Sequence, residues 1–99
     1  MSEILKFAFR GEQDPDEIEA DLALAVFAAE CIYGRPQVRL ETRYLVGLGG
    51  RSCVMKISGT AGESAARVFT GLATARHGEE AISISRHQEQ PFKEINVGA

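Results

Sequence analysis

The sequence is poor in the residues that mark disulfide-stabilised and metal-binding proteins. Its 99 residues include two cysteines and two histidines, which are widely scattered and form no close-spaced ligand pair. Two cysteines do not make a disulfide framework, so we expect Cys31 and Cys53 to be reduced thiols of a cytoplasmic protein. We therefore expect neither a metal site nor a cofactor.

Long apolar runs are also missing. The longest nearly uncharged segment, Leu22–Tyr33, contains Glu30 and is too short to cross a bilayer. The first ten residues lack the charged and apolar regions of a secretory signal, so we expect no membrane association. A net charge of −3 argues against general nucleic-acid binding. With 44% apolar and 25% charged residues, the composition is typical of a globular domain.

The stretch Gln37–Ser58 indicates a β-hairpin. Apolar residues recur at every second position in both halves, which is the period of a strand with one buried face. Gly49 and Gly50 suit a two-residue turn that needs positive φ at both positions. That turn fixes a register with these opposing pairs on the apolar side: Val46 with Cys53, Tyr44 with Met55, and Thr42 with Ile57.

Two helices and two further strands flank this hairpin. A strand at Ile4–Phe9 precedes a helix that begins after Asp14, with Pro15 at its first position, and ends near Tyr33 before Gly34. After the hairpin, Thr60 and Glu63 resemble a capping box, which predicts a helix from about residue 61 to residue 77. Ala81–Arg86 is the fourth expected strand, with Ile82 and Ile84 facing inward.

This order predicts an α+β fold of the ferredoxin-like β-α-β-β-α-β type. Four antiparallel strands would form one sheet with both helices on one face and the first and third strands in the centre. We expect a single domain over residues 1–88 and a C-terminal tail over residues 89–99. Many unrelated functions share this architecture, so the fold implies no activity.

The first helix is apolar on two sides. Its core stripe is expected to contain Ile18, Leu22, Ala25, Val26, Ala29, Ile32 and Tyr33. Leu24, Phe27 and Cys31 lie on roughly the opposite side, and such a face requires a cover. Three covers remain open: the chain's own tail with Phe92 and Ile95, a second copy, or another protein. These five residues are the predicted partner-binding residues.

A second hypothesis concerns the open face of the sheet. Strand parity places four basic residues there, and we predict that they bind a small anion or an acidic partner: Lys6, Arg39, Arg43 and Lys56. RNA binding on such a face needs exposed aromatic residues for stacking, whereas Phe7, Phe9 and Tyr44 point inward by parity.

Catalytic patterns are not indicated. Cys53 falls on the inward face of a strand, and Cys31 has no histidine near it in sequence, so neither suits a nucleophile. We therefore expect a non-enzymatic protein–protein interaction module that is a homodimer or a subunit of a larger assembly. An adaptor, an inhibitor and an assembly chaperone all fit this description. The alternative is a regulatory domain that binds a small anionic ligand or an acidic partner on the basic open face of the sheet.

Overall fold

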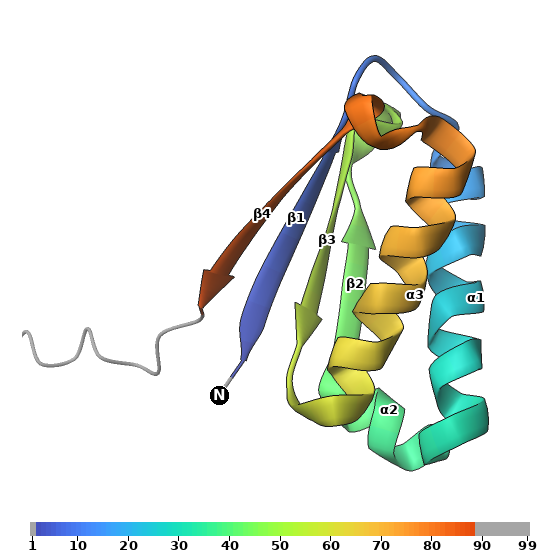
Figure 1. Ribbon diagram of the computed structural model, residues 1–99, viewed down its shortest axis with the longest axis vertical. Helices are drawn as coiled ribbons and strands as arrows, with labels where there is room; N and C mark the ends of the chain where they lie inside the picture. The colour runs from blue at the N-terminus through green and yellow to red at the C-terminus, as the bar shows by residue number, and fades with distance from the viewer. Residues whose placement is uncertain (1, 89–99) are drawn as a thin grey trace, which may run out of the picture.

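The computed structural model describes residues 2–88. The strands are β1 (Glu3–Phe9), β2 (Thr42–Val46), β3 (Ser52–Ile57) and β4 (Ile82–Gln88). The α-helices are α1 (Pro15–Tyr33), α2 (Arg35–Glu41) and α3 (Gly59–His77), and two short 3₁₀ helices are η1 (Leu48–Gly50) and η2 (Glu79–Ala81). Figure 1 shows one sheet with α1 and α3 packed on the same side.

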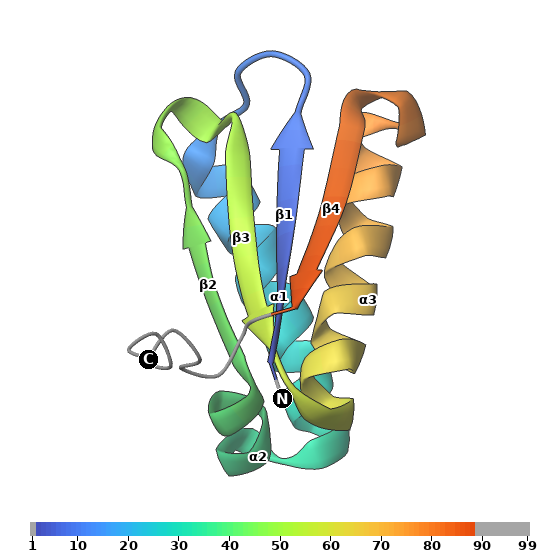
Figure 2. The same cartoon turned by 90° about the vertical axis from the view of Figure 1, so that its left-hand side faces the viewer.

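The sheet is antiparallel, with the order β2-β3-β1-β4. This is the ferredoxin-like arrangement, and the prediction that the first and third strands are central is confirmed. Figure 2 looks onto the open face of the sheet, with the helices behind it. No helix among the described residues is long and apolar enough to cross a membrane.

The core lies between the sheet and the two long helices. Alternate residues of β1 and β3 face the helices, among them the fully buried Phe7 and Met55. The ring of Phe7 meets that of Phe69 from α3 edge to face, with centroids 4.9 Å apart and planes at 88°. This geometry suits the quadrupoles of two aromatic rings. The aromatic pair therefore joins the sheet to α3 at the centre of the molecule.

The first helix begins and ends as its sequence predicts. The side chain of Asp14 accepts a hydrogen bond from the amide of Asp16, and Pro15 occupies the first turn. Gly34, with φ of 91°, follows the last turn. Ile32 and Tyr33 were expected in the core, but their side chains are 72% and 36% exposed, which corrects that prediction.

The strand predicted from residue 37 is wrong in its first half. Residues 35–41 form the helix α2, in which Val38 is buried while Leu40 is 81% exposed. The second half is correct, because β2 pairs with β3 in the predicted register, with Tyr44 opposite Met55. Gly49 and Gly50 have φ of 74° and 65°, as predicted, but they lie in a longer loop that contains η1 instead of a two-residue turn.

The predicted capping box of α3 is also wrong. The helix begins at Gly59, and its N-cap residue, Ser58, makes no side-chain hydrogen bond. The amides of Ala61 and Gly62 instead donate to the carboxylate of Glu41, at 2.9 and 3.2 Å. The last residue of α2 thus supplies the cap of α3, from about twenty residues away in the sequence.

Candidate functional site

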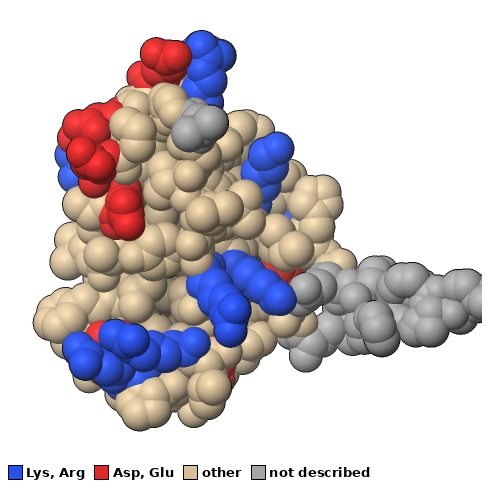
Figure 3. Space-filling model, turned by 180° about the vertical axis from the view of Figure 1, so that it is seen from behind, with Lys and Arg blue, Asp and Glu red and all other residues tan. Residues whose placement is uncertain are grey.

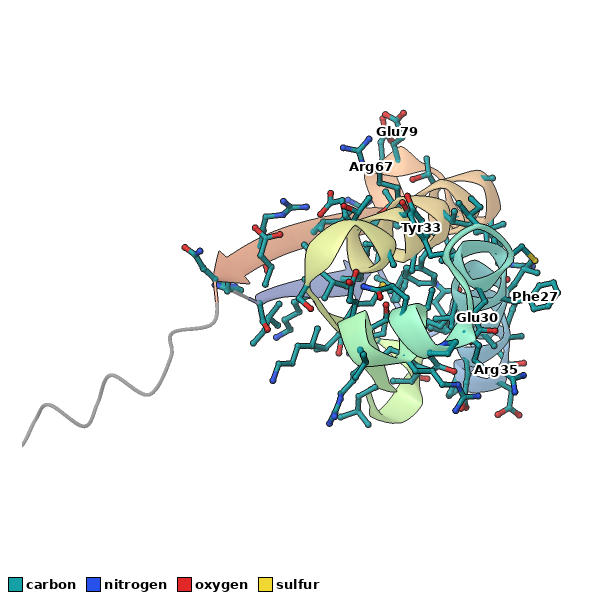
Figure 4. The ribbon with its side chains drawn as sticks, turned by 90° about the horizontal axis from the view of Figure 1, so that it is seen from below. Phe27, Glu30, Tyr33, Arg35, Arg67 and Glu79 are labelled. Atoms are coloured by element: carbon teal, nitrogen blue, oxygen red, sulfur yellow. The ribbon has the colours of Figure 1, made fainter. Side chains whose placement is uncertain are left out.

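The outer face of α1 exposes several apolar residues. Leu24 is 51% exposed and Phe27 is 59% exposed, and Cys31 is also exposed, as the sequence predicts for all three. In Figure 4, Phe27 points away from the body of the molecule. Neighbouring alanines at positions 20 and 23 are exposed as well. We call Ala20, Leu24, Phe27 and Cys31 the outer stripe.

The outer stripe has the spacing of a helix-packing seam. Its residues are four, three and four positions apart, which keeps them within about 60° of one another at about 100° per residue. The stripe covers about 17 Å of helix, at a rise of about 1.5 Å per residue. It contains no charged residue, so its surface would be more stable against another apolar surface than in water.

Charges of opposite sign lie at the two ends of the outer stripe. The acidic residues Asp16 and Glu17 occupy the first turn of α1, and α2 carries Arg35 and Arg39 just beyond its last turn. Figure 3 shows Asp and Glu at the upper left, Lys and Arg at the lower left, and uncharged surface between them. Arg35 and Arg39 contact Glu30 only at 4.0 and 3.9 Å, so both retain the capacity for further ion pairs.

A cleft lies beside the edge strand β2. We call it the α1–β2 cleft; its volume is about 440 Å³, and it is lined by Val26, Glu30, Val38, Arg39, Thr42, Arg43 and Tyr44. Val26 and Val38 give it an apolar wall, and Arg39 and Arg43 border it. The Oγ1 of Thr42 is inaccessible and has no hydrogen-bond partner within the described residues.

In a second cleft, between α3 and β4, the charged side chains form ion pairs with one another. Its volume is about 310 Å³. Arg86 contacts Glu3 at 3.1 Å and Glu63 at 3.5 Å, and Glu63 also pairs with Arg67. Ile84, expected to face the core, is 45% exposed at this cleft, and every residue of β4 after Ile82 is exposed.

The four predicted anion-binding residues do not share one surface. Arg43 and Lys56 are opposite one another on β2 and β3, and Lys6 is in β1, as expected for the open face. Arg39 is on α2, so its predicted place on the sheet is wrong. Arg43 nevertheless lines the α1–β2 cleft together with Arg39, because β2 is an edge strand. The sequence pattern gave no sign of this cleft.

The two cysteines have different environments. Cys53 is buried on the inward face of β3, as predicted, and burial raises the pKa of its thiol to about 12. Cys31 is exposed on the outer stripe. Within residues 2–88, no three His, Cys, Asp or Glu side chains gather in a way that would hold a metal ion.

An ion pair between the buried Asp21 and the partly exposed Arg76 ties α1 to α3. Asp21 is only 4% exposed, and both of its oxygens accept from Arg76, at 2.7 and 2.9 Å. These contacts, first the hydrogen bond and then the charges of Asp21 and Glu17, raise the pKa of Arg76. The pair satisfies its own hydrogen bonds, so it is a structural link and not part of a reactive site.

Two predicted partner-binding residues, Phe92 and Ile95, lie outside the described residues. The structure therefore describes Leu24, Phe27 and Cys31 of that set and brings these three together on one face of α1.

Comparison with known proteins adds only a fold likeness. No protein-family model and no curated protein matches the chain. Among solved structures, the chain is similar to the solution NMR structure of a de novo designed protein with a ferredoxin fold. The two are 13% identical, the match covers 93% of this chain and 88% of that chain, and the TM-score is 0.43. The strand order and pairing described above are what define this chain as a ferredoxin-like α+β protein.

Proposed function

We propose that this protein is a non-enzymatic interaction module that assembles by pairing two copies along the outer stripe of α1. The observation that carries this proposal is the half-exposed Phe27, next to the half-exposed Leu24, on an uncharged helix face. Large aromatic residues dominate the energy of protein interfaces, so a protruding phenylalanine on such a face is a natural anchor. Whether the resulting dimer acts as an adaptor, an inhibitor or an assembly factor depends on its further partners.

The charges at the ends of the stripe favour an antiparallel pair. A parallel pair would place the acidic first turns together and the arginines of α2 together. In an antiparallel pair about a two-fold axis, Leu24 of one copy meets Phe27 of the other, and Asp16 lies near Arg35 of the other copy. The same patch then serves both copies, which is the rule for a closed dimer. Small residues at positions 20, 23 and 28 let the two helices approach closely.

The interface is of modest size, so we expect a moderate affinity. A standard stable interface buries about 800 Å² per partner. The interface approaches this area only if it includes the charged residues at both ends of the outer stripe. We expect a dissociation constant of the order of 10 μM. The monomer mass is 10.7 kDa, so dimer formation doubles it and is easily measured.

Analytical ultracentrifugation of the full chain, from about 1 μM to about 1 mM, is the direct test. Wild type should move from monomer to dimer over this range, and Phe27→Asp should stay a folded monomer throughout. Leu45→Asp is the matched control, because Leu45 is 73% exposed on the open face of the sheet. If Leu45→Asp removes the dimer while Phe27→Asp keeps it, the interface is the sheet and not the helix.

A charge swap tests the antiparallel arrangement. Arg35→Glu alone should weaken the dimer, because it faces the acidic first turn of the other helix. Adding Asp16→Lys should restore the affinity, because the opposing charges again differ in sign. The proposed orientation would be contradicted if the double variant dimerises more weakly than Arg35→Glu alone or Asp16→Lys alone. A wild type that remains monomeric at about 1 mM would refute dimerisation itself.

A further inference from the structure

The edge of β2 carries free hydrogen-bonding capacity. The amide of Gly47 donates to Ser52 at 2.8 Å, and the amide of Ser58 donates to Glu41 at 2.9 Å. These bonds mark the two ends of the β2–β3 pairing, and partners in an antiparallel ladder alternate. The N–H and C=O groups of Arg43 and Leu45 therefore face β3, and those of Thr42 and Tyr44 face away from it.

Within residues 2–88, no strand pairs with that outer side. β2 is the last strand of the order β2-β3-β1-β4, and Figure 2 shows it at the margin of the sheet, with α2 at its lower end. An exposed strand edge is a template for a further strand. The α1–β2 cleft opens along this same edge, because Thr42, Arg43 and Tyr44 line it. A segment added to β2 would thus lie in the cleft.

The side chains around the cleft define the segment that fits it. A strand paired with β2 turns alternate side chains towards the helices, where Val26, Val38 and Tyr44 offer apolar contact. The other side chains share the open face with Arg43, which has no ion pair within residues 2–88 and stands across from Lys56. Arg39 adds a cation at the rim. We propose that the α1–β2 cleft binds an extended peptide of alternating apolar and acidic residues, which adds to the sheet as a fifth strand beside β2.

The charge pattern opposes the obvious competitors for this edge. Two β2 strands paired antiparallel about Tyr44 would bring the Arg43 side chains of both copies to diagonal positions on one face, about 7–8 Å apart. A small anion would leave the main-chain groups of the β2 edge without a strand to pair with. A peptide pairs with those groups, and its acidic side chains meet Arg43 where a second β2 strand would bring another arginine. The site is separate from the outer stripe, so it does not rest on the proposed dimer.

The test uses the ¹⁵N-labelled full chain and a capped hexapeptide of alternating aspartate and valine. We expect titration to shift the amides of Thr42, Tyr44 and Val46 most, with peptide-to-β2 contacts in nuclear Overhauser spectra. A peptide with lysine in place of aspartate should bind at least about tenfold more weakly. A peptide methylated on alternate amide nitrogens should also lose about tenfold, because it cannot donate to the edge.

Arg43→Gln should weaken binding of the aspartate peptide about two- to fivefold. Arg67→Gln is the matched control, since Arg67 is an exposed arginine of α3 far from β2 in sequence, and it should leave the affinity unchanged. Phe27→Asp should also leave it unchanged, which separates this site from the dimer interface. Equal binding of all three peptides, shifts confined to other elements, or no shift at millimolar peptide would each overturn the proposal.

Discussion

Glu41 is the residue whose replacement best tests how α2 and α3 stabilise the fold. Its carboxylate accepts hydrogen bonds from the amides of Ala61 and Gly62, and its backbone oxygen accepts from the amide of Ser58 at 2.9 Å. Gln37, one turn earlier in α2, donates to the same carboxylate. The first amides of a helix have no partner within the helix, so this external acceptor satisfies two of them. Its negative charge also lies at the positive end of the helix dipole.

The size of the effect follows from these contacts. Loss of an N-cap side chain costs about 0.5–2 kcal/mol, and a hydrogen bond to a charged group contributes about 1.5–3 kcal/mol. Because one oxygen serves both amides and the site is only partly buried, we expect Glu41→Ala to cost about 2 kcal/mol. For a domain of this size the melting temperature falls by about 4–8 °C per kcal/mol, hence by about 8–16 °C. Glu41→Gln keeps an acceptor but loses the charge and should cost about half as much.

Thermal and urea unfolding followed by circular dichroism measure these differences. The control is Glu63→Ala, because Glu63 is the residue that the sequence places in a capping box of α3. In the structure, Glu63 makes only partly exposed ion pairs with Arg67 and Arg86, so its loss should cost less than about 1 kcal/mol. The reasoning is refuted if Glu63→Ala destabilises the protein as much as Glu41→Ala, or if Glu41→Ala costs less than about 0.5 kcal/mol.

Two further predictions concern the thiols and the β2–β3 loop. Iodoacetamide at pH 8 should modify the folded chain once, at the exposed Cys31, because burial shields Cys53 and raises the pKa of its thiol to about 12. Mass spectrometry of the folded and the urea-unfolded chain checks this, and double modification of the folded chain would contradict it. Gly50→Ala should destabilise the fold by about 2 kcal/mol or more in urea unfolding, because φ is 65° there and a Cβ would collide with the backbone of Gln13. A stability equal to wild type would show that the loop rearranges freely.

The fold could be predicted from the sequence because local signals agreed with one another. The Asp14 and Pro15 start and the Gly34 end define α1 within its own residues. The register of β2 and β3 followed from the alternation of apolar residues, although the connecting loop is longer than the two-residue turn that suggested it. A buried face on each strand excludes a slip of one residue, which would turn the apolar side chains to the open face, so the register survives this change of loop.

The sequence failed where the deciding contact is distant along the chain. Val38 and Leu40 alternate like strand residues, but Pro36 in the first turn is typical of a helix start and was the available signal for α2. Glu41 is tied to the start of α3, a contact that no local pattern reports. Ile32 had helical periodicity, yet it is exposed. Periodicity gives the direction of a side chain and not what covers it.

The helical conformation of residues 35–41 also allows the outer stripe and the α1–β2 cleft to be tested separately. The strand predicted from Gln37 would have placed Arg39 among the basic residues of the sheet. As a helix, residues 35–41 place Arg35 and Arg39 beside Glu30, at the end of the outer stripe and at the rim of the α1–β2 cleft. Arg35 is needed for the antiparallel dimer and does not line the cleft. Arg35→Glu should therefore weaken dimerisation while Arg43 still holds the acidic peptide, whereas a loss of both would mean that α2 itself has moved.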